Sequence, residues 1–440
     1  MRLVGSLVLV LASLLLSADP AAAQGAAATS PVLTPLDSLM PELEKLYIEL
    51  HQSPELSLQE EKTSAKMATL LRGLGFEVTE KVGGWGVVGV MKNGAGPTVL
   101  VRADMDGLPV EEKTGLAYAS KVTAKNAAGE TVHVMHACGH DFHMTSWIGA
   151  ATLLSRAKNR WKGTLVFIGQ PAEEGGNGAR NMLEDGLFTR FPKPDFAIGL
   201  HDKADGAVGT IHYTPGFALA NVDSVDITFF GKGGHGAYPH TTVDPIVIAS
   251  RFVVAVQTLV ARENNPVDPA VVTVGSFHAG TKHNIIPDDA RLQLTVRSYK
   301  DEVRKALVDG ITRLAKAEAA AARAPKEPEV KVTEGTPATY NDPKLVSRVV
   351  PALRRALGEQ AVVEAPPVMG GEDFSEYGRA GVPAFLWWVG AVEPSRIETA
   401  KKEGTTLPSL HSPLFAPHPS ALKTGAASLT AAALELLGKS

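Results

Sequence analysis

The feature that most restricts the fold of this chain is a series of buried strands, each followed directly by polar side chains. We predict strands over 98–102, 164–169 and 196–200, with a helix near 146–157 between the first two. Strands that alternate with helices indicate a largely parallel sheet with helices on both faces. Ligands of such sheets bind at the carboxyl ends of the strands, so the side chains that follow these strands are candidates for a functional site.

One short stretch, His136-Ala-Cys-Gly-His-Asp-Phe-His143, concentrates groups that bind metals. It contains the only cysteine of the 440 residues and three histidines. Cys138 and His140 could reach one metal centre from a tight turn. A lone cysteine is more often a small buried hydrophobe, and a lone histidine a satisfied polar group. The metal interpretation is favoured by further donors near the ends of predicted strands, namely Glu173, Glu174, His201 and His411.

The N-terminus predicts export. Arg2 precedes an apolar run over 3–16, and Ala21, Ala22 and Ala23 are small residues of the kind that signal peptidase cleaves. The run is short for a membrane-spanning helix, so we predict a signal peptide over 1–23 and a linker over 24–36, with an uncleaved anchor as the alternative. Export implies a secreted or periplasmic protein, in which metal ligation better explains one unpaired cysteine.

The remaining chain is long enough for two domains. A change of pattern near 221 begins a β-α-β-β-α-β order that ends near 334, with Asp244 as the N-cap of the first helix. We therefore predict a ferredoxin-like α+β domain over 221–336, inserted into a parallel-rich α/β domain formed by 37–220 and 337–440. A formal net charge of −4 gives no indication of binding to nucleic acid or to an anionic membrane.

Several ordered motifs resemble those of the M20 metallopeptidases, in particular the amidohydrolase subgroup that includes hippurate hydrolase, N-acyl-amino-acid amidohydrolases and auxin-conjugate hydrolases. The motifs are LHQSPELS at 50–57, RADMDGLP at 102–109, HACGHDFHM at 136–144, QPAEEGGNGAR at 170–180, GKGGHGAYPH at 231–240, MGGEDF at 369–374 and HSPLF at 411–415. The resemblance covers nearly the whole chain after the signal segment. It implies that the α/β domain is catalytic, that the inserted domain is a lid that often mediates dimerisation, and that the cleft holds two divalent metal ions.

The resemblance also implies a role for each candidate residue. Glu173 would be the general base, and Asp104 would orient the metal ligands without binding a metal itself. His235 of the lid would donate a hydrogen bond to the tetrahedral oxyanion, in its own subunit or in a partner subunit. Asp106 and Asp141 would support the ligands or cap local turns. The implied metal ligands are Cys138, His140, Glu174, His201 and His411.

These roles predict a metal-dependent amidohydrolase. A divalent metal lowers the pKa of water to roughly 7 from about 16, and Glu173 would carry the proton to the leaving amine. The predicted substrates are N-acyl amino acids or small peptides, whose free carboxylate Asn284 and Arg297 would bind, since guanidinium binds carboxylate through two hydrogen bonds. Zinc or manganese suits the donors, with cobalt and nickel as further options.

Other functions remain as alternatives at this point. Within the same family they are a dipeptidase or carboxypeptidase and a deacetylase. Outside it, a non-catalytic periplasmic binding protein would keep the fold, since fold does not determine function. Glu173 argues against a pure binding protein, because such a protein has no use for a free base beside the metals.

Two positions depart from the pattern of the subgroup. Asp202-Lys-Ala-Asp205 forms the turn after His201, where the branch usually has a proline. Phe142 stands where a small residue is common. Both lie close to predicted ligands in the sequence, so we expect them to affect the substrate pocket and to leave the ligand set intact.

Overall fold

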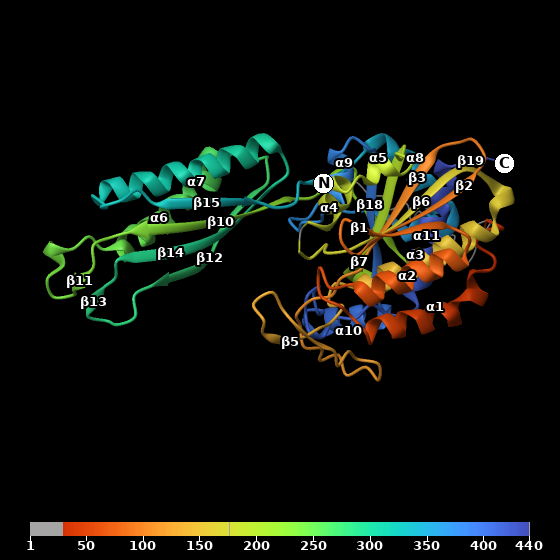
Figure 1. Ribbon diagram of the computed structural model, residues 1–440, viewed down its shortest axis with the longest axis horizontal. Helices are drawn as coiled ribbons and strands as arrows, with labels where there is room; N and C mark the ends of the chain where they lie inside the picture. The colour runs from red at the N-terminus through yellow and green to blue at the C-terminus, as the bar shows by residue number, and fades with distance from the viewer. Residues whose placement is uncertain (1–29, 176, 440) are drawn as a thin grey trace, which may run out of the picture.

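The computed structural model describes residues 30–175 and 177–439, and within them the molecule consists of two bodies joined by extended strands (Figure 1). The predicted signal peptide over 1–23 lies outside the described residues, as do residues 24–29 of the predicted linker. Val32 and Leu33, at the end of that linker, are buried in the hydrophobic core of the larger body. The chain therefore packs onto the core before the first helix begins.

The larger body contains a nine-stranded sheet in the order β1-β2-β6-β3-β7-β18-β8-β17, with β19 paired to β6. The four strands β6, β3, β7 and β18 at its centre are parallel. The pairs β1–β2, β2–β6 and β18–β8 are antiparallel, and β17 at the edge is parallel to β8. The predicted parallel-rich sheet is confirmed at this centre. The strands are β1 (Glu77–Val82), β2 (Gly86–Asn93), β3 (Thr98–Asp104), β6 (Trp161–Gln170), β7 (Phe196–Ala207), β8 (Ile211–Tyr213), β17 (Val362–Glu364), β18 (Ala384–Val392) and β19 (Gly438–Lys439).

Helices cover both faces of this sheet, because alternate side chains of each strand point to opposite faces. Val99 and Val101 of β3 belong to one hydrophobic core, and Leu100 between them belongs to the other. The first core includes α1 (Leu36–His51), α2 (Glu61–Gly73), α3 (His140–Arg156), α8 (Pro343–Leu357) and α11 (Ala421–Leu436). The second includes α4 (Gly178–Glu184), α5 (Leu187–Arg190) and α9 (Ser375–Arg379). Outside these layers lie α10 (Pro394–Glu403), the pair β4 (Thr123–Lys125) and β5 (Thr131–His133), and the pair β9 (Gly216–Leu219) and β16 (Thr339–Asn341).

The smaller body is a four-stranded antiparallel sheet in the order β12-β14-β10-β15, with two helices packed on one face. This is the ferredoxin-like α+β arrangement predicted from the sequence. The carboxylate of Asp244 accepts a hydrogen bond from the backbone N–H of Ile246 at 2.9 Å and so caps the first helix as expected. The elements are β10 (Asn221–Phe230), α6 (Pro245–Thr258), β12 (Ala270–Ala279), β14 (Asp289–Ser298), α7 (Asp301–Ala321) and β15 (Glu329–Glu334).

A small pair of strands, β11 (Gly234–His235) and β13 (Ile285–Ile286), closes the free end of this smaller body. Figure 1 shows the pair at the end that points away from the larger body. We call the smaller body the lid and this part of it the lid tip (residues 231–243 and 280–288).

Two elements near the candidate ligands differ from the predictions. The helix α3 begins at His140 rather than near 146, because Gly139 adopts a positive φ of 71° and turns the chain directly into the helix. The strand β7 does not end before His201 but continues to Ala207. His201 and Asp202 therefore lie within a strand paired to β18, and no turn follows His201.

Candidate metal centre and active site

The five predicted metal ligands lie together near the carboxyl ends of the parallel strands. Cys138 and His140 lie at the turn into α3, Glu174 in the loop after β6, His201 in β7, and His411 in the loop before α11. Donor atoms of Cys138, His140 and His201 lie within 4.8 Å of one another, as do those of Cys138, Glu174 and His411. The two groups of three donors share the thiol.

Short contacts link these donors through Cys138 and Glu174. The Sγ atom of Cys138 is 3.5 Å from Nε2 of His201 and 3.3 Å from Nε2 of His411. The Oε1 atom of Glu174 is 3.2 Å from Nε2 of His411 and 3.9 Å from Nε2 of His140. The two groups thus offer two ion positions side by side.

The donors fit divalent cations. Both ring nitrogens of His140 are buried, and neither makes a well-oriented hydrogen bond among the described residues, although Nδ1 lies 3.3 Å from Oδ1 of Asp106. Such burial is costly unless another group binds the free nitrogen. Burial raises the pKa of the Cys138 thiol, but the neighbouring His201 and His140 together outweigh this effect and the pKa lies below its usual value. Hydrogen bonds to Cys138 and Glu174 raise the pKa of His411 to about 10. A cation binding here would therefore displace protons, as metals do when they bind thiolate and imidazole.

Asp106 holds the loop that carries the two glutamates. Its carboxylate accepts hydrogen bonds from the backbone N–H groups of Glu173 at 3.1 Å and Glu174 at 3.0 Å, and from Oγ of Ser57 at 2.5 Å. Its Oδ1 atom also lies 3.3 Å from Nδ1 of His140. Of the two predicted readings for Asp106, these contacts favour support of the ligands over a local cap.

Asp104 connects the ligands to a buried ionic network. Its Oδ1 atom is 2.6 Å from Nδ1 of His143, and its Oδ2 atom accepts a hydrogen bond from Arg102 at 2.6 Å. The same Oδ2 atom lies 3.7 Å from Nε2 of His140. Arg102, which is 1 % exposed, also pairs with Glu372 and Asp373 of the MGGEDF motif at 2.7 and 3.0 Å. Asp104 therefore lies behind the ligand cluster, where the sequence analysis expects it.

Asp202 is part of the site, although the sequence analysis places it in a turn. It is buried in β7, and its Oδ1 atom lies 3.0 Å from Nε2 of His143 and 3.3 Å from Nδ1 of His201. The carbonyl oxygen of Asp202 accepts a hydrogen bond from Nδ1 of His201 at 2.8 Å. Histidine ligands commonly donate their second ring nitrogen in this way. The sequence feature that indicates this role for Asp202 is its position directly after the predicted ligand His201.

The bulk of Phe142 does not enter this cluster. The residue is fully buried and belongs to the core shared by α3 and α11. A Cβ atom at Gly425 of α11 would lie 3.2 Å from Cζ of the Phe142 ring, so the ring fills the space between the two helices. Our expectation that Phe142 shapes the substrate pocket is not supported by this position.

Glu173 lies beside the ligands and forms a further group of possible cation donors with His140 and Glu174. Its carboxylate lies within 4.8 Å of donor atoms of His140 and Glu174, and Oε1 is 3.4 Å from the backbone N of Asp373. Burial raises its pKa well above the usual value, and the carboxylates of Glu372, Asp373 and Glu174 add to this effect. A carboxylate with a raised pKa beside a metal site is suited to accepting a proton.

The predicted substrate-binding residues do not lie together in one chain. His235 and Asn284 are neighbours at the lid tip, where the backbone N–H of Gly236 donates to the carbonyl oxygen of Asn284 at 2.8 Å (Figure 1). Arg297 lies at the opposite end of β14, and its Nη1 donates to the carbonyl oxygen of Met369 in the larger body at 3.1 Å. The grouping of Asn284 with Arg297 therefore does not hold within one chain.

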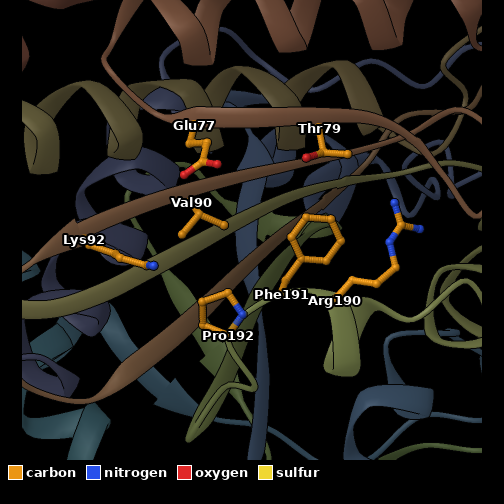
Figure 2. A pocket seen from close by; sticks show the side chains of 7 residues that line it. All are labelled: Glu77, Thr79, Val90, Lys92, Arg190, Phe191 and Pro192. Carbon is orange, nitrogen blue, oxygen red and sulfur yellow. The ribbon is translucent and has the colours of Figure 1, made fainter.

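A cavity of about 310 Å³ at the edge of the nine-stranded sheet is separate from this site (Figure 2). Arg190 at its rim already pairs with Asp185 at 2.7 Å. None of the candidate ligands lines it. The lining residues are Glu77, Thr79, Val90, Lys92, Arg190, Phe191 and Pro192.

Comparison with known proteins gives consistent results. The profile of Peptidase family M20/M25/M40 matches residues 100–412. A hippurate hydrolase of Campylobacter jejuni is 38 % identical over a region that covers 76 % of this chain and 85 % of the relative. A thermostable carboxypeptidase 2 of Saccharolobus solfataricus is 38 % identical, with coverage of 86 % and 91 %. The crystal structure of the Bacillus subtilis YXEP protein, a dinuclear metal-binding peptidase, superposes with a TM-score of 0.72 at 32 % identity and covers 91 % of this chain and all of its own.

Proposed function

Because the chain belongs to the peptidase family M20/M25/M40, a family of hydrolases, we propose that it cleaves the amide bond of N-acyl amino acids or of small peptides with a free carboxylate. The observation that carries this proposal is the cluster of five donors with Glu173, a free carboxylate of raised pKa, beside it. A site built only to hold metals would not require that carboxylate.

The five donors would hold two divalent ions, with Cys138 common to both groups. Zinc or manganese suits this mixture of thiolate, imidazole and carboxylate, and cobalt or nickel would also be accommodated. When bound, such ions polarise an amide carbonyl and bring the pKa of water to roughly 7. His140 and His201 would be kept in orientation by Asp106 and by the carbonyl oxygen of Asp202.

Glu173 would transfer the proton that the reaction must move. It takes a proton from water as the water oxygen attacks the amide carbon, and delivers it to the nitrogen as the carbon–nitrogen bond breaks. The products are a carboxylic acid and a free amine. Asp106, which binds the backbone N–H groups of Glu173 and Glu174, would keep the base and the ligand in fixed relative positions.

We propose that a second subunit completes the active site. His235 and Asn284 lie at the lid tip, and an oxyanion donor from a partner's lid would contribute about 3 kcal/mol to transition-state stabilisation. Two exposed valines on α6, Val247 at 53 % and Val254 at 73 % exposure, and the edge strand β12 are candidates for the contact between lids. By length and composition Pro245–Glu263 would also suffice to cross a membrane, but Phe252 and other residues of its inner face are buried in the lid core.

Arg297 would bind the carboxylate of the substrate. Its pKa is lowered by burial alone, so no carboxylate among the described residues stabilises its charge. A half-buried guanidinium without an acidic partner favours an anionic ligand. Its place at the base of the lid, beside Met369, would let substrate binding connect the lid to the catalytic body.

Two related activities remain alternatives, and the relatives support both of them. A carboxypeptidase or dipeptidase is supported by the similarity to thermostable carboxypeptidase 2 at 38 % identity. A deacetylase, which would use the same site with a smaller acyl group, is supported by the similarity to an N-acetyl-L-cysteine deacetylase of Bacillus subtilis at 39 % identity. We propose that the protein acts outside the cytoplasm, as a secreted or periplasmic enzyme, on the basis of its N-terminal sequence.

The test is hydrolysis of a panel of N-acyl amino acids and dipeptides by the metal-loaded protein, with Glu173→Ala in parallel. Turnover by the wild type that disappears in the variant, with unchanged metal content, supports the hydrolase and identifies the acyl class. A wild type that retains its metals and hydrolyses no member of the panel would instead be a binding protein.

A further inference from the structure

The connection between α1 and α2 (residues 51–60, called here the α1–α2 connection) contains polar side chains that the proposed reaction does not use. His51 and Glu60 are fully buried, and Ser57 is half-buried. Burying a polar side chain is costly unless it makes a hydrogen bond, so the partners of these residues are informative. His51 contacts the first turn of α3, whereas Ser57 and Glu60 both help to hold the loop after β6.

His51 connects α1 to the first turn of α3. Its Nδ1 atom is 2.6 Å from Oδ2 of Asp141, and its Nε2 atom is 3.0 Å from Oε1 of Glu112. All three side chains are inaccessible to solvent. Asp141 directly follows His140, so this contact fixes the start of the helix that carries a candidate ligand. It also shows that Asp141 is not a simple turn cap.

The same end of α1 also holds the segment that carries His411. The backbone N–H of Lys113, next to Glu112, donates to the carbonyl oxygen of Pro413 at 2.7 Å. The hydroxyl of Tyr47, one turn before His51, donates to the carbonyl oxygen of Pro417 at 2.9 Å. His411 adopts a positive φ of 65°, a conformation that is unfavourable for a residue other than glycine and persists only when its surroundings fix it.

Ser57 and Glu60 hold the loop that carries the two glutamates. Ser57 donates to Asp106, which binds the backbone N–H groups of Glu173 and Glu174. Glu60 Oε1 accepts a hydrogen bond from the backbone N–H of Ala172 at 2.7 Å. Ala172 has a positive φ of 51°, so Glu60 stabilises a strained turn directly before the proposed base.

We propose that the α1–α2 connection is a positioning segment, in which His51, Ser57 and Glu60 hold the start of α3 and the loop of the two glutamates in the geometry that binds two metal ions. None of the three is proposed to touch an ion or substrate. This inference rests on the proposed metal centre. The physical reason is that donors already held in place lose little conformational freedom when ions bind, and loss of such outer contacts typically lowers metal affinity about 10–100-fold.

Two variants of His51 separate its two contacts. In His51→Asn the side-chain amide nitrogen replaces Nδ1 and can still donate to Asp141, whereas in His51→Gln it replaces Nε2 and can donate only to Glu112. We expect His51→Gln to weaken Zn²⁺ or Co²⁺ binding about 10–100-fold and His51→Asn to weaken it less. The dissociation constants are measured by chelator competition well below the unfolding temperature of the metal-free protein, which is recorded separately by circular dichroism.

The other two side chains have matched variants. Glu60→Ala removes the acceptor for Ala172 and should weaken metal binding, whereas Glu60→Gln keeps an acceptor oxygen and should bind nearly as tightly as wild type. Ser57→Ala removes the donor to Asp106 and should weaken binding as well. Glu61→Ala, an exposed neighbour at the start of α2, should leave the dissociation constant unchanged.

These readouts distinguish positioning from general stability. Weaker metal binding by the folded variants, with kcat largely restored at saturating metal, supports the proposal. Wild-type metal affinity in His51→Gln, Ser57→Ala and Glu60→Ala, with only a lower unfolding temperature of the metal-free protein, would overturn it. Metal affinity is measured without substrate, so a failure to detect hydrolysis would count against the proposed function and not against this inference.

Discussion

The metal centre buries most of its functional side chains, with His411 at 53 % exposure as an exception, whereas the lid tip exposes its own. At the metal centre, His140, Asp104 and Asp106 are at most 1 % exposed and lie within a network of short contacts. At the lid tip, His235 is exposed and its Nδ1 accepts a hydrogen bond from the neighbouring Ala237 at 3.0 Å, while Ile285 opposite it is 52 % exposed. One chain therefore brings its ligand cluster together by itself and leaves the lid tip as an exposed surface, which in our proposal joins the active site of another subunit.

The largest effect on activity is expected for Glu173, the proposed general base beside the ligand cluster. Glu173→Gln should lower kcat about 10²–10⁴-fold, because the amide cannot take the proton of the attacking water. The metal content should stay at the wild-type value, since Glu173 is not one of the five proposed ligands. Steady-state kinetics and metal analysis check this together. More than a tenth of wild-type kcat in the variant would exclude Glu173 as the base.

A somewhat smaller loss is expected at the lid tip. His235→Asn should lower kcat about 10²–10³-fold, because it removes one donor to the oxyanion. Metal affinity should not change, since the lid tip takes no part in the ligand cluster. A loss of metal affinity in this variant would show that the lid tip contributes to the ligand cluster, and would contradict the distinction between the two regions.

The base of the lid should affect binding more than turnover. Arg297→Met should raise KM for N-acyl amino acids about 10–100-fold, because a charge-assisted contact to the substrate carboxylate is lost. The KM for substrates whose carboxylate is amidated should change little, and these substrates serve as the matched control. A KM that rises equally for both kinds of substrate would assign Arg297 to holding Met369 instead.

A still smaller effect should appear in the stability of the catalytic body at alkaline pH. The carboxylates of Asp141 and Glu112 outweigh burial and raise the pKa of His51 from 6.5 to about 10. A histidine whose pKa is higher in the folded than in the unfolded state stabilises the fold by being protonated. This stabilisation is fully present below pH 6.5, the unfolded pKa, and is lost as the pH rises through about 10, the folded pKa.

The free energy of unfolding of the metal-free wild type should therefore fall between pH 7 and 10, and that of His51→Asn should fall less. Denaturant titrations across this range measure the difference. Glu61→Ala, at an exposed position of α2, should follow the wild-type curve. Parallel curves for the wild type and His51→Asn would contradict the buried ionic role of His51.

Most of the preformed centre was predictable from the sequence, whereas the division of the site between two regions was not. Cys138, Glu174 and His201 are recognisable because they follow buried strands or lie in motifs that resemble a known family. The position of Arg297 depends on strand register: only the pairing of β14 with β10 shows that Arg297 and the lid tip lie at opposite ends of the same sheet. No local pattern in the chain reveals that separation.

The supporting residues were missed for a different reason. His51 and Asp141 are 90 positions apart in the sequence, and Arg102 and Glu372 are 270 apart, so the contact exists only in the folded chain. Asp202 is expected in a turn because the resembled branch usually has a proline-containing turn after this histidine, but β18 pairs with this segment and keeps it extended. Tertiary pairing overrides local propensity at such positions.

The central claim is that the preformed metal centre of one subunit works with the lid tip of another. Its most direct test is to mix Glu173→Gln and His235→Asn subunits, each inactive alone, after reversible dissociation. The account predicts recovery of up to about a quarter of wild-type activity, because half of the dimers would be mixed and each would contain one site with both residues intact. No recovery in a sample shown to contain mixed dimers would contradict it, since both residues would then have to act within the same subunit.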